Sequence, residues 1–359
     1  MLTKHHKYWI FSVSLLILTI LAKLFFLKGL VYGLDYGLFH PDGMLYSFKT
    51  LSFLGHSQLS AGSEVAKFYL ENAATKPHIS PESLFYENNT NWQIFQLRLL
   101  YPLLSVPFVY LFGLWGMLVL PVLSFVILWF FASAKLANRP FIGIVVLLVL
   151  SSSTTISRWM FSNISDPLLV GLITIYIWFL PRFSKSTNLR LIAFHGFFIL
   201  TTGLTRFSLL LWFAVAMYFL INKKLGVALA ISALAFVVFL PNLFVSFSGA
   251  ILASHASSPW YFKLLLFPWV LVKMHIVEFG QLFVLDRVFL LGFCCTIWVA
   301  LWNLRDSKAL LFILVLLSLI ATAGLNGVLG VNFRYHLPAL PFALSFLAQH
   351  QGRSLELRK

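Results

Sequence analysis

Apolar runs long enough to form membrane-crossing helices recur along the whole of this sequence. A helix needs roughly 17 to 25 apolar residues to cross about 30 Å of hydrocarbon, and several runs are at or below this length. The runs span about Tyr8–Phe26, Leu114–Ala134, Phe141–Ile156, Leu168–Leu180, Leu191–Leu204, Ser208–Ile221, Leu225–Val245, Val288–Leu304, Ala309–Gly324 and Leu337–Ala348. They predict an all-α fold of about ten transmembrane helices, whose outer faces meet lipid instead of water.

The composition also indicates a polytopic membrane protein. Hydrophobic residues make up 60% of the 359 positions, charged residues make up 10%, and the mean hydropathy is +0.90. Such a chain cannot cover itself with a polar surface, so we predict one integral membrane domain over residues 1–359. The formal net charge of +15 does not indicate a nucleic-acid partner, because the cations stand at the ends of apolar runs and form no patch with interleaved aromatics.

The segment Arg98–Gly113 decides the predicted orientation, because it is apolar but short and contains Pro102 and Pro107. If it crossed the membrane, the later cationic loops would lie outside, against the positive-inside bias. If it lies at the outer interface, the same loops lie inside. We therefore predict juxtamembrane helices in a first outer loop over residues 31–113, a second outer segment over residues 246–287, and both termini in the cytoplasm.

This orientation gathers most of the carboxylates on the outer side. Nine of the 11 acidic residues are predicted there: Asp35, Asp42, Glu64, Glu71, Glu82, Glu87, Asp166, Glu278 and Asp286. Four outer arginines each stand next to a membrane boundary: Arg98, Arg158, Arg206 and Arg334. Cations placed against the usual bias need a counter-charge. A lipid phosphate is one explanation, since the guanidinium fork binds phosphate well, and a neighbouring acid or lipid headgroup is the other.

Several short motifs resemble the GT-C superfamily of polyprenyl-phosphate-sugar-dependent glycosyltransferases. His40-Pro41-Asp42 resembles the start of the first outer loop in its eukaryotic mannosyltransferases. The segments 98–104 and 165–168 resemble the R-x-L-x-P-L-L and S-[DE]-P-L motifs of bacterial mannosyltransferase-like members. Arg334-Tyr335 and the two prolines that follow resemble the R-Y-x-L-P-x-x-P motif of many final helices.

The resemblance implies an enzyme that transfers a monosaccharide, with mannose as one candidate, from a polyprenyl-phosphate carrier to a lipid, glycan or protein acceptor. Transfer would occur at the outer face of a bacterial plasma membrane, with inversion at the anomeric carbon and with membrane lipids as surroundings. Superfamily members commonly carry a second carboxylate directly after the first, but here that position is Gly43. This departure weakens the case for a metal ion and leaves Asp35 as the only nearby substitute. We predict no metal site, no cofactor and no large acceptor-recognition domain.

Sugar transfer from a phosphate carrier requires a base for the acceptor hydroxyl and cations for the departing phosphate. We predict Asp42 as the base, because partial desolvation at a membrane boundary raises a carboxyl pKa while nearby arginine lowers it. Asp42 can also simply start a helix, since Pro-Asp-Gly is good turn chemistry and Asp is a good N-cap. The predicted substrate-binding residues are Asp35, His40, Tyr46, Arg98, Asp166, Arg206, Arg334, Tyr335 and His336.

A purely structural role, without substrate contact, is also open for several of these residues. Tyr46 follows the candidate base by one helical turn, but an interfacial tyrosine often serves only as an aromatic anchor. Asp166 can cap the helix it opens, and Arg158 or Arg206 can simply pair with it. His336 can be held in place by a hydrogen bond alone. Weaker candidates for acceptor or sugar contacts are Glu64, Glu71 and Asp286.

Two other classes of protein stay open as well. A transporter or a flippase for lipid-linked sugars would also be polytopic and basic. Transporters, however, usually contain internal repeats and interrupted helices with polar groups at the midplane. A membrane scaffold would not need acids and arginines gathered on one side.

The two cysteines, Cys294 and Cys295, are adjacent inside an apolar run. Neighbouring backbone geometry disfavours a disulfide between them. We therefore predict two free thiols that are buried as small apolar groups.

Overall fold

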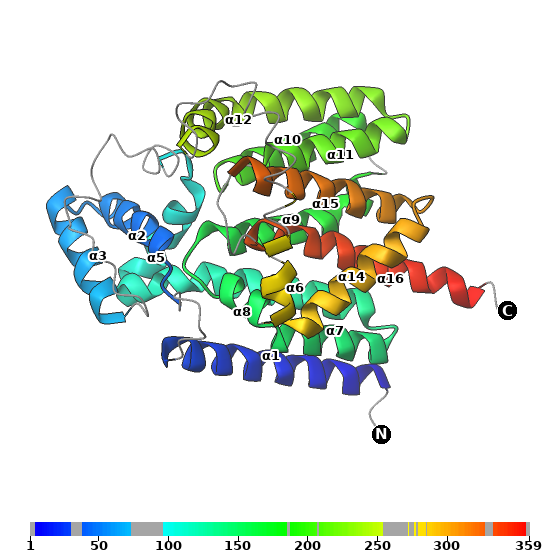
Figure 1. Ribbon diagram of the computed structural model, residues 1–359, viewed down its shortest axis with the longest axis horizontal. Coiled ribbons are helices and arrows are strands. Elements are labelled where there is room, and N and C mark those ends of the chain that lie inside the picture. The colour runs from blue at the N-terminus through cyan, green and yellow to red at the C-terminus, as the bar shows by residue number, and fades with distance from the viewer. Residues whose placement is uncertain are drawn as a thin grey trace.

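The computed structural model describes residues 4–29, 38–72, 96–184, 187–206, 208–253, 272, 276–277, 279–284, 286–326 and 333–356. Within these ranges every regular element is a helix and no β-strand occurs, which confirms the predicted all-α fold. Most of the helices form one bundle and run roughly along the long axis of the molecule (Figure 1).

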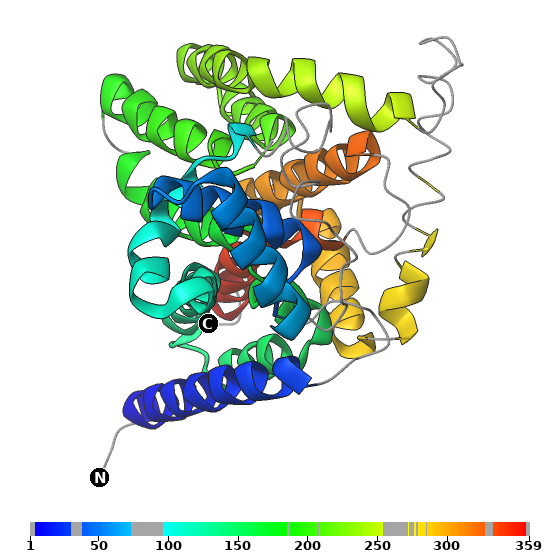
Figure 2. The ribbon, with the colours of Figure 1, turned by 90° about the vertical axis from the view of Figure 1, so that its left-hand side faces the viewer.

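The bundle contains α1 (Lys4–Gly29), α6 (Val119–Leu136), α7 (Pro140–Ser152), α9 (Ser165–Phe183), α10 (Asn188–Gly203), α11 (Leu209–Ile221), α12 (Leu225–Ala253), α14 (Arg287–Trp302), α15 (Ser307–Asn326) and α16 (Leu340–Glu356). Three further helices, α2 (Pro41–Phe53), α3 (Gln58–Asn72) and α5 (Leu100–Phe112), gather at one end, on the left in Figure 1. Figure 2 shows the blue α2 and α3 in front of the bundle. We call this the α2–α3 end. The start of α1 and the end of α16 both lie at the opposite end, which we call the terminal end.

Three stretches are long and apolar enough to cross a membrane, namely Lys4–Phe25, Leu100–Leu136 and Ser165–Phe183. A fourth is present if α7 and α8 (Thr154–Met160) form one bent span, and five shorter apolar helices of 10–17 residues accompany them in the described ranges. Large apolar side chains such as those of Leu18 and Phe141 are exposed on the outside. This is a membrane-embedded helical protein, and the predicted number of ten spans stays a prediction.

The chain turns back on itself between α5 and α6. Gly113 has a φ of 59°, in the left-handed region that glycine adopts without strain. The following 3-10 helix, η2 (Gly113–Leu118), packs against α5. A Cβ on Gly116 would lie 2.2 Å from the carbonyl oxygen of Phe108, which a straight helix would place about 12 Å away. The apolar stretch Leu100–Leu136 therefore folds back at η2 and is not one straight helix.

The span predicted over Phe141–Ile156 is bent, because α8 turns away from α7 by 65°; the two helices form either one broken span or a re-entrant loop. Ser153 starts α8, since its Oγ accepts a hydrogen bond from the backbone N–H of Ile156 at 3.0 Å and donates to the Asp286 carboxylate at 2.6 Å. Asp286 also accepts from the N–H of Thr155 at 2.9 Å and caps α14. This buried carboxylate joins three helices, so we no longer assign it an acceptor contact.

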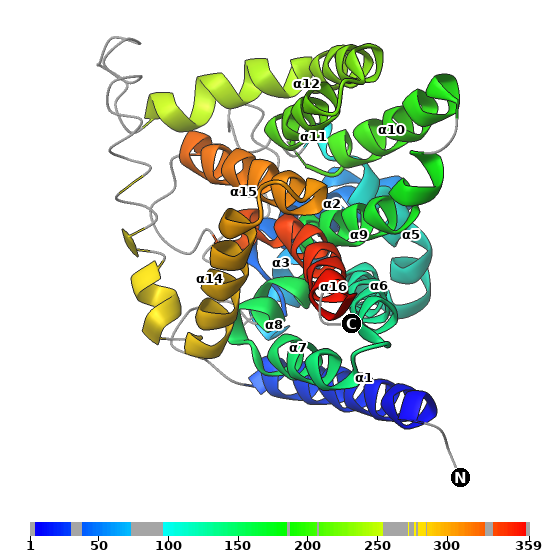
Figure 3. The ribbon, with the colours of Figure 1, turned by 90° about the vertical axis from the view of Figure 1, so that its right-hand side faces the viewer.

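The last helix, α16, lies in the middle of the bundle, where it contacts α6, α9, α14 and α15 (Figure 3). Polar side chains connect neighbouring helices, as is common where apolar packing alone provides little specificity. The Oγ atoms of Ser12 and Ser133 lie 2.7 Å apart, and the indole N–H of Trp129 donates to Ser12 Oγ at 3.0 Å. Because η3 leads into α16, this central position fixes the segment that carries Arg334.

The prediction that both cysteines are buried needs correction. Cys294 and Cys295 are free thiols, but both are exposed on α14 instead of buried. The helix α12 continues to Ala253, so the predicted second outer segment, 246–287, begins as helix. Most of the rest of that segment lies outside the described residues.

Candidate active site

Asp42 and Arg334 meet at the α2–α3 end, although 292 residues separate them in the sequence. Arg334 Nη1 donates a hydrogen bond to Asp42 Oδ2 at 2.9 Å. Asp42 stands in the first turn of α2, and Arg334 stands in η3 (Phe333–Tyr335), which leads through η4 (Leu337–Ala339) into α16. The side chain of Asp42 is 35% exposed and that of Arg334 is 16% exposed. The candidate base and the candidate phosphate ligand are therefore direct neighbours.

His40 fixes the start of α2. Its Nδ1 accepts the backbone N–H of Asp42 at 3.1 Å, so the helix is capped by His40 and the Asp42 carboxylate is left for other contacts. The N–H of His40 donates to Asn163 Oδ1 at 2.9 Å. Burial and the nearby arginines lower the pKa of His40 to about 4 against the opposing charge of Asp42, so the ring is neutral at pH 7 with its hydrogen on Nε2. His40 was predicted to bind substrate, and its contacts position the start of α2.

Asn163 occupies the space beside Gly43. A Cβ on Gly43 would lie 2.2 Å from Asn163 Oδ1. The amide cannot move aside easily, because its Nδ2 donates to the hydroxyl of Tyr69 and the backbone N–H of Asn163 donates to the carbonyl of Leu38 at 3.0 Å. There is no room for a second carboxylate at position 43. This packing explains why position 43 holds glycine.

Replacement of Gly43 by Ala is expected to lower the free energy of unfolding by about 1–3 kcal/mol, because the added methyl group overlaps the Asn163 amide. Thermal unfolding in detergent measures the change. Gly292→Ala on α14 is the matched control, since a Cβ there meets nothing within 4 Å. That control should keep or raise the melting temperature. Equal melting temperatures for the two variants would contradict the close contact.

A second ion pair lies deeper in the cluster. Asp166, in the first turn of α9, pairs with Arg206, and their side chains are only 6% and 5% exposed. The alternative that Arg206 simply pairs with Asp166 is therefore confirmed. The guanidinium carbon of Arg206 lies 4.2 Å from the ring centre of Tyr335, and that of Arg334 lies 5.4 Å from it. Burial raises the pKa of the Tyr335 hydroxyl, but the charges of the two arginines outweigh it and lower that pKa.

Tyr46 connects α2 to the start of α9. Its side chain is buried, and its hydroxyl lies 2.7 Å from Ser165 Oγ. Arg98 Nη1 donates to the same hydroxyl at 3.2 Å. Tyr46 is thus not an exposed aromatic anchor, and it holds Arg98 close to the first ion pair.

The cluster carries more positive than negative charge. In the described part of the chain, four guanidinium groups, from Arg98, Arg158, Arg206 and Arg334, accompany two carboxylates and a neutral His40. Arg158 belongs to the cluster because it stacks on Trp159 at 4.8 Å, and the same ring lies 5.4 Å from Arg334. The buried Nε of Arg334 meets no acceptor among the described residues. Surplus guanidinium with an unused donor suits an anionic ligand.

The charge surplus changes the expected acidity of the candidate base. Burial raises the pKa of Asp42, but the charge of Arg334 and the hydrogen bond from Arg334, with the charge of Arg98, outweigh it and lower the pKa to about 2. The sequence predicts both effects, a rise of this pKa from desolvation and a fall from nearby arginine. Because Arg334 contacts the carboxylate, it lowers the pKa of Asp42 more than burial raises it. Asp42 is therefore ionised at pH 7.

The other predicted residues are not all part of the cluster. His336 is buried directly before η4. Glu64 pairs with His56 at 3.3 Å on the exposed side of α3, and Glu71 is exposed on the same helix. Asp35 lies outside the described residues. Where the chain is described, no three His, Cys, Asp or Glu side chains are placed to hold a metal ion together.

No protein-family model matches this chain, and no curated protein or solved structure matches it. Its membership of the GT-C superfamily is therefore a proposal. That proposal rests on the geometry of the cluster and on the motifs that meet there.

Proposed function

We propose that this chain is a GT-C-type membrane glycosyltransferase of about ten spans in a bacterial plasma membrane. It transfers a monosaccharide, with mannose as one candidate, from polyprenyl phosphate to a lipid, glycan or protein acceptor. The observation that carries the proposal is the contact of Asp42 with Arg334 inside a cluster that has surplus guanidinium groups. The cluster stands at one end of an apolar bundle, where a membrane-bound donor and an acceptor from the water layer can meet.

In the proposed reaction the acceptor hydroxyl oxygen attacks the anomeric carbon of the sugar. The bond between that carbon and the phosphate oxygen breaks, and the hydroxyl proton passes to Asp42. The departing phosphate keeps the electron pair of the broken bond, and Arg334 and Arg98 stabilise its negative charge. Both groups are within one cluster, as this division of roles requires.

Donor binding would also activate the base. A carboxylate with a pKa of about 2 is a weak base, because general-base catalysis is most efficient when the pKa is near the working pH. When the donor phosphate binds Arg334, the arginine charge is shared between two anions and the pKa of Asp42 rises. Asp42 would then accept a proton only when donor is present.

The remaining members of the cluster would position these two groups. The Asp166–Arg206 pair holds Arg206 against the ring of Tyr335, and Arg334 lies near the same ring. His40 caps the helix that carries Asp42. We therefore propose phosphate contacts for Arg334 and Arg98 and a supporting role for Arg206.

The test is sugar transfer by the purified protein in liposomes that contain a labelled polyprenyl-phosphate sugar. A glycosyltransferase releases polyprenyl phosphate and labels an added acceptor. A flippase would move the donor across the bilayer without cleaving it, and a scaffold would do neither. Donor translocation with no release of polyprenyl phosphate, over a panel of sugars and acceptors, would reject the enzyme.

A further inference from the structure

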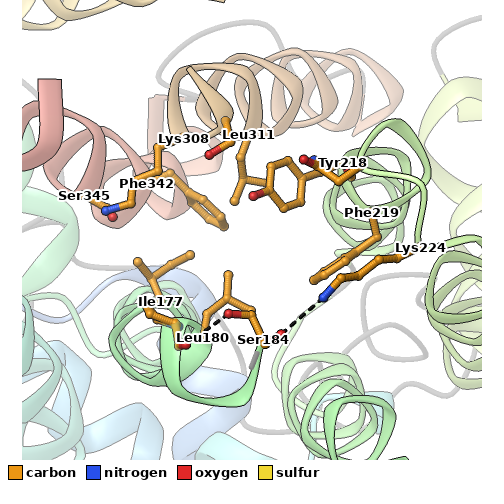
Figure 4. A pocket seen from close by; sticks show the side chains of 13 residues that line it. Ile177, Leu180, Ser184, Tyr218, Phe219, Lys224, Lys308, Leu311, Phe342 and Ser345 are labelled. Atoms are coloured by element: carbon orange, nitrogen blue, oxygen red, sulfur yellow. Dashed lines mark hydrogen bonds between the residues drawn. The ribbon is translucent and has the colours of Figure 1, made fainter. Parts of the chain in front are cut away.

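A cavity of about 250 Å³ opens at the terminal end of the bundle, among α9, α11, α15 and α16 (Figure 4). The helix α9 carries Asp166 in its first turn and lines the cavity from Ile177 to Ser184. At 1.5 Å per residue, the cavity is roughly 16 to 27 Å further along α9 than Asp166. It is therefore separate from the candidate active site.

The cavity has apolar walls and a basic rim. Ile177, Leu311 and Phe342 are buried apolar residues of its lining. In Figure 4 the ammonium group of Lys224 lies at one side of the opening, and that of Lys308 lies at the other side, turned toward Ser345. The ammonium group of Lys224 donates to the carbonyl oxygen of Ser184 at 3.2 Å, which leaves two of its three N–H donors for a ligand.

The charge near the rim is positive on balance. The carboxylate of Asp306 is occupied at the start of α15, where its Oδ1 accepts the backbone N–H of Lys308 at 2.8 Å and its Oδ2 accepts from Gln349 at 3.3 Å. Lys135 is close enough to Lys308 to act on it electrostatically. Lys135, Lys224 and Lys308 thus outnumber the carboxylate.

We propose that this cavity binds an anionic phospholipid from the leaflet at the terminal end. The phosphate lies beside Lys224, Lys308 adds positive charge at the other side of the rim, and the start of an acyl chain follows the apolar wall. Basic pockets between membrane helices on the cytoplasmic side commonly hold anionic headgroups, and this is the side that the charge bias predicts for the terminal end. The volume is slightly below the roughly 300–1,000 Å³ of ligand pockets, so it suits a headgroup with part of a chain.

The experiment is native mass spectrometry of the full chain, purified from nanodiscs that contain phosphatidylglycerol and phosphatidylcholine in equal amounts. We expect retained phosphatidylglycerol in the wild-type protein. Lys224→Ala with Lys308→Ala should weaken its binding roughly thirtyfold, as expected for the loss of two lysines next to an anionic lipid. Arg305→Ala is the control for charge, because Arg305 is exposed at the same end and does not line the cavity.

A second variant tests the cavity without changing its charge. Ser345→Leu adds apolar volume to the lining and should expel the lipid, while sugar transfer and the melting temperature stay near the wild-type values. Equal retention of both lipids by the wild-type protein would overturn the proposal, and so would an equal loss of lipid in Arg305→Ala. Displacement by polyprenyl phosphate or by inorganic phosphate alone would show that the ligand is not a phospholipid.

Discussion

Replacement of Asp42 by Asn is expected to lower the rate of sugar transfer by about 100- to 10,000-fold, the usual contribution of a positioned general base. The substitution keeps the size of the side chain and the cap from His40, but it removes the proton acceptor. The side chain of Asp42 is 35% exposed, so the protein should stay folded in detergent. Turnover in liposomes with a labelled donor measures the rate, and the melting temperature reports the fold.

Glu64→Gln is the matched control for this loss of charge. Glu64 lies on α3 at the same end, its side chain is 45% exposed, and its partner is His56. Transfer by the control should stay within about twofold of wild type, as is usual for a surface substitution. Wild-type turnover in Asp42→Asn would remove Asp42 from the mechanism.

The largest expected effect on stability comes from the buried pair of Asp166 and Arg206. Asp166→Asn or Arg206→Met alone should lower the free energy of unfolding by about 3–5 kcal/mol, because each leaves one buried charge without its partner. The double variant Asp166→Leu with Arg206→Met should recover most of this loss, since apolar residues of similar volume often replace a buried pair at little cost. Denaturant-induced unfolding in mixed micelles gives the three values.

The exposed pair of His56 and Glu64 provides the comparison. Glu64→Gln removes its charge and should cost less than about 1 kcal/mol, because water screens an exposed pair. Additive losses for Asp166 and Arg206, with no recovery in the double variant, would show that the two residues do not act as a buried pair.

Much of the cluster was predictable because charges are rare in this sequence. Asp42 lies in the loop after the first apolar run and Arg334 lies just before the last one, and the charge bias places both on one side of the membrane. The structure brings them to 2.9 Å. The sequence also indicated that Asp166 and Arg206 could pair, since both flank predicted spans. The charge pattern thus predicted which residues form the cluster. The structure was needed to show which of them are in contact.

The neutral partners were not predictable in the same way. Asn163 and Tyr69 hold the start of α2 against α9, yet neither differs from many other polar residues in the sequence. The glycine at position 43 was noted only as a missing carboxylate, because nothing in the sequence indicates that Asn163 fills its side-chain space.

Helix breaks were the other weakness of the sequence patterns. A hydropathy window does not detect the turn at Ser153, because α7 and α8 together are apolar enough to pass as one span. The run of five hydroxyl residues at positions 151–155 was the available signal, since serine and threonine favour helix starts. The exposure of Cys294 shows a related limit, because in a membrane protein an apolar residue can face lipid as easily as the core.

Binding of a labelled polyprenyl-phosphate sugar in nanodiscs tests most directly whether Asp42 and Arg334 form the donor site. Arg334→Ala removes a charge-assisted hydrogen-bond donor and should weaken binding roughly tenfold to a hundredfold. Arg287→Ala, at an exposed position at the start of α14, should leave the affinity unchanged. Wild-type affinity in a folded Arg334→Ala variant would contradict the proposed donor site.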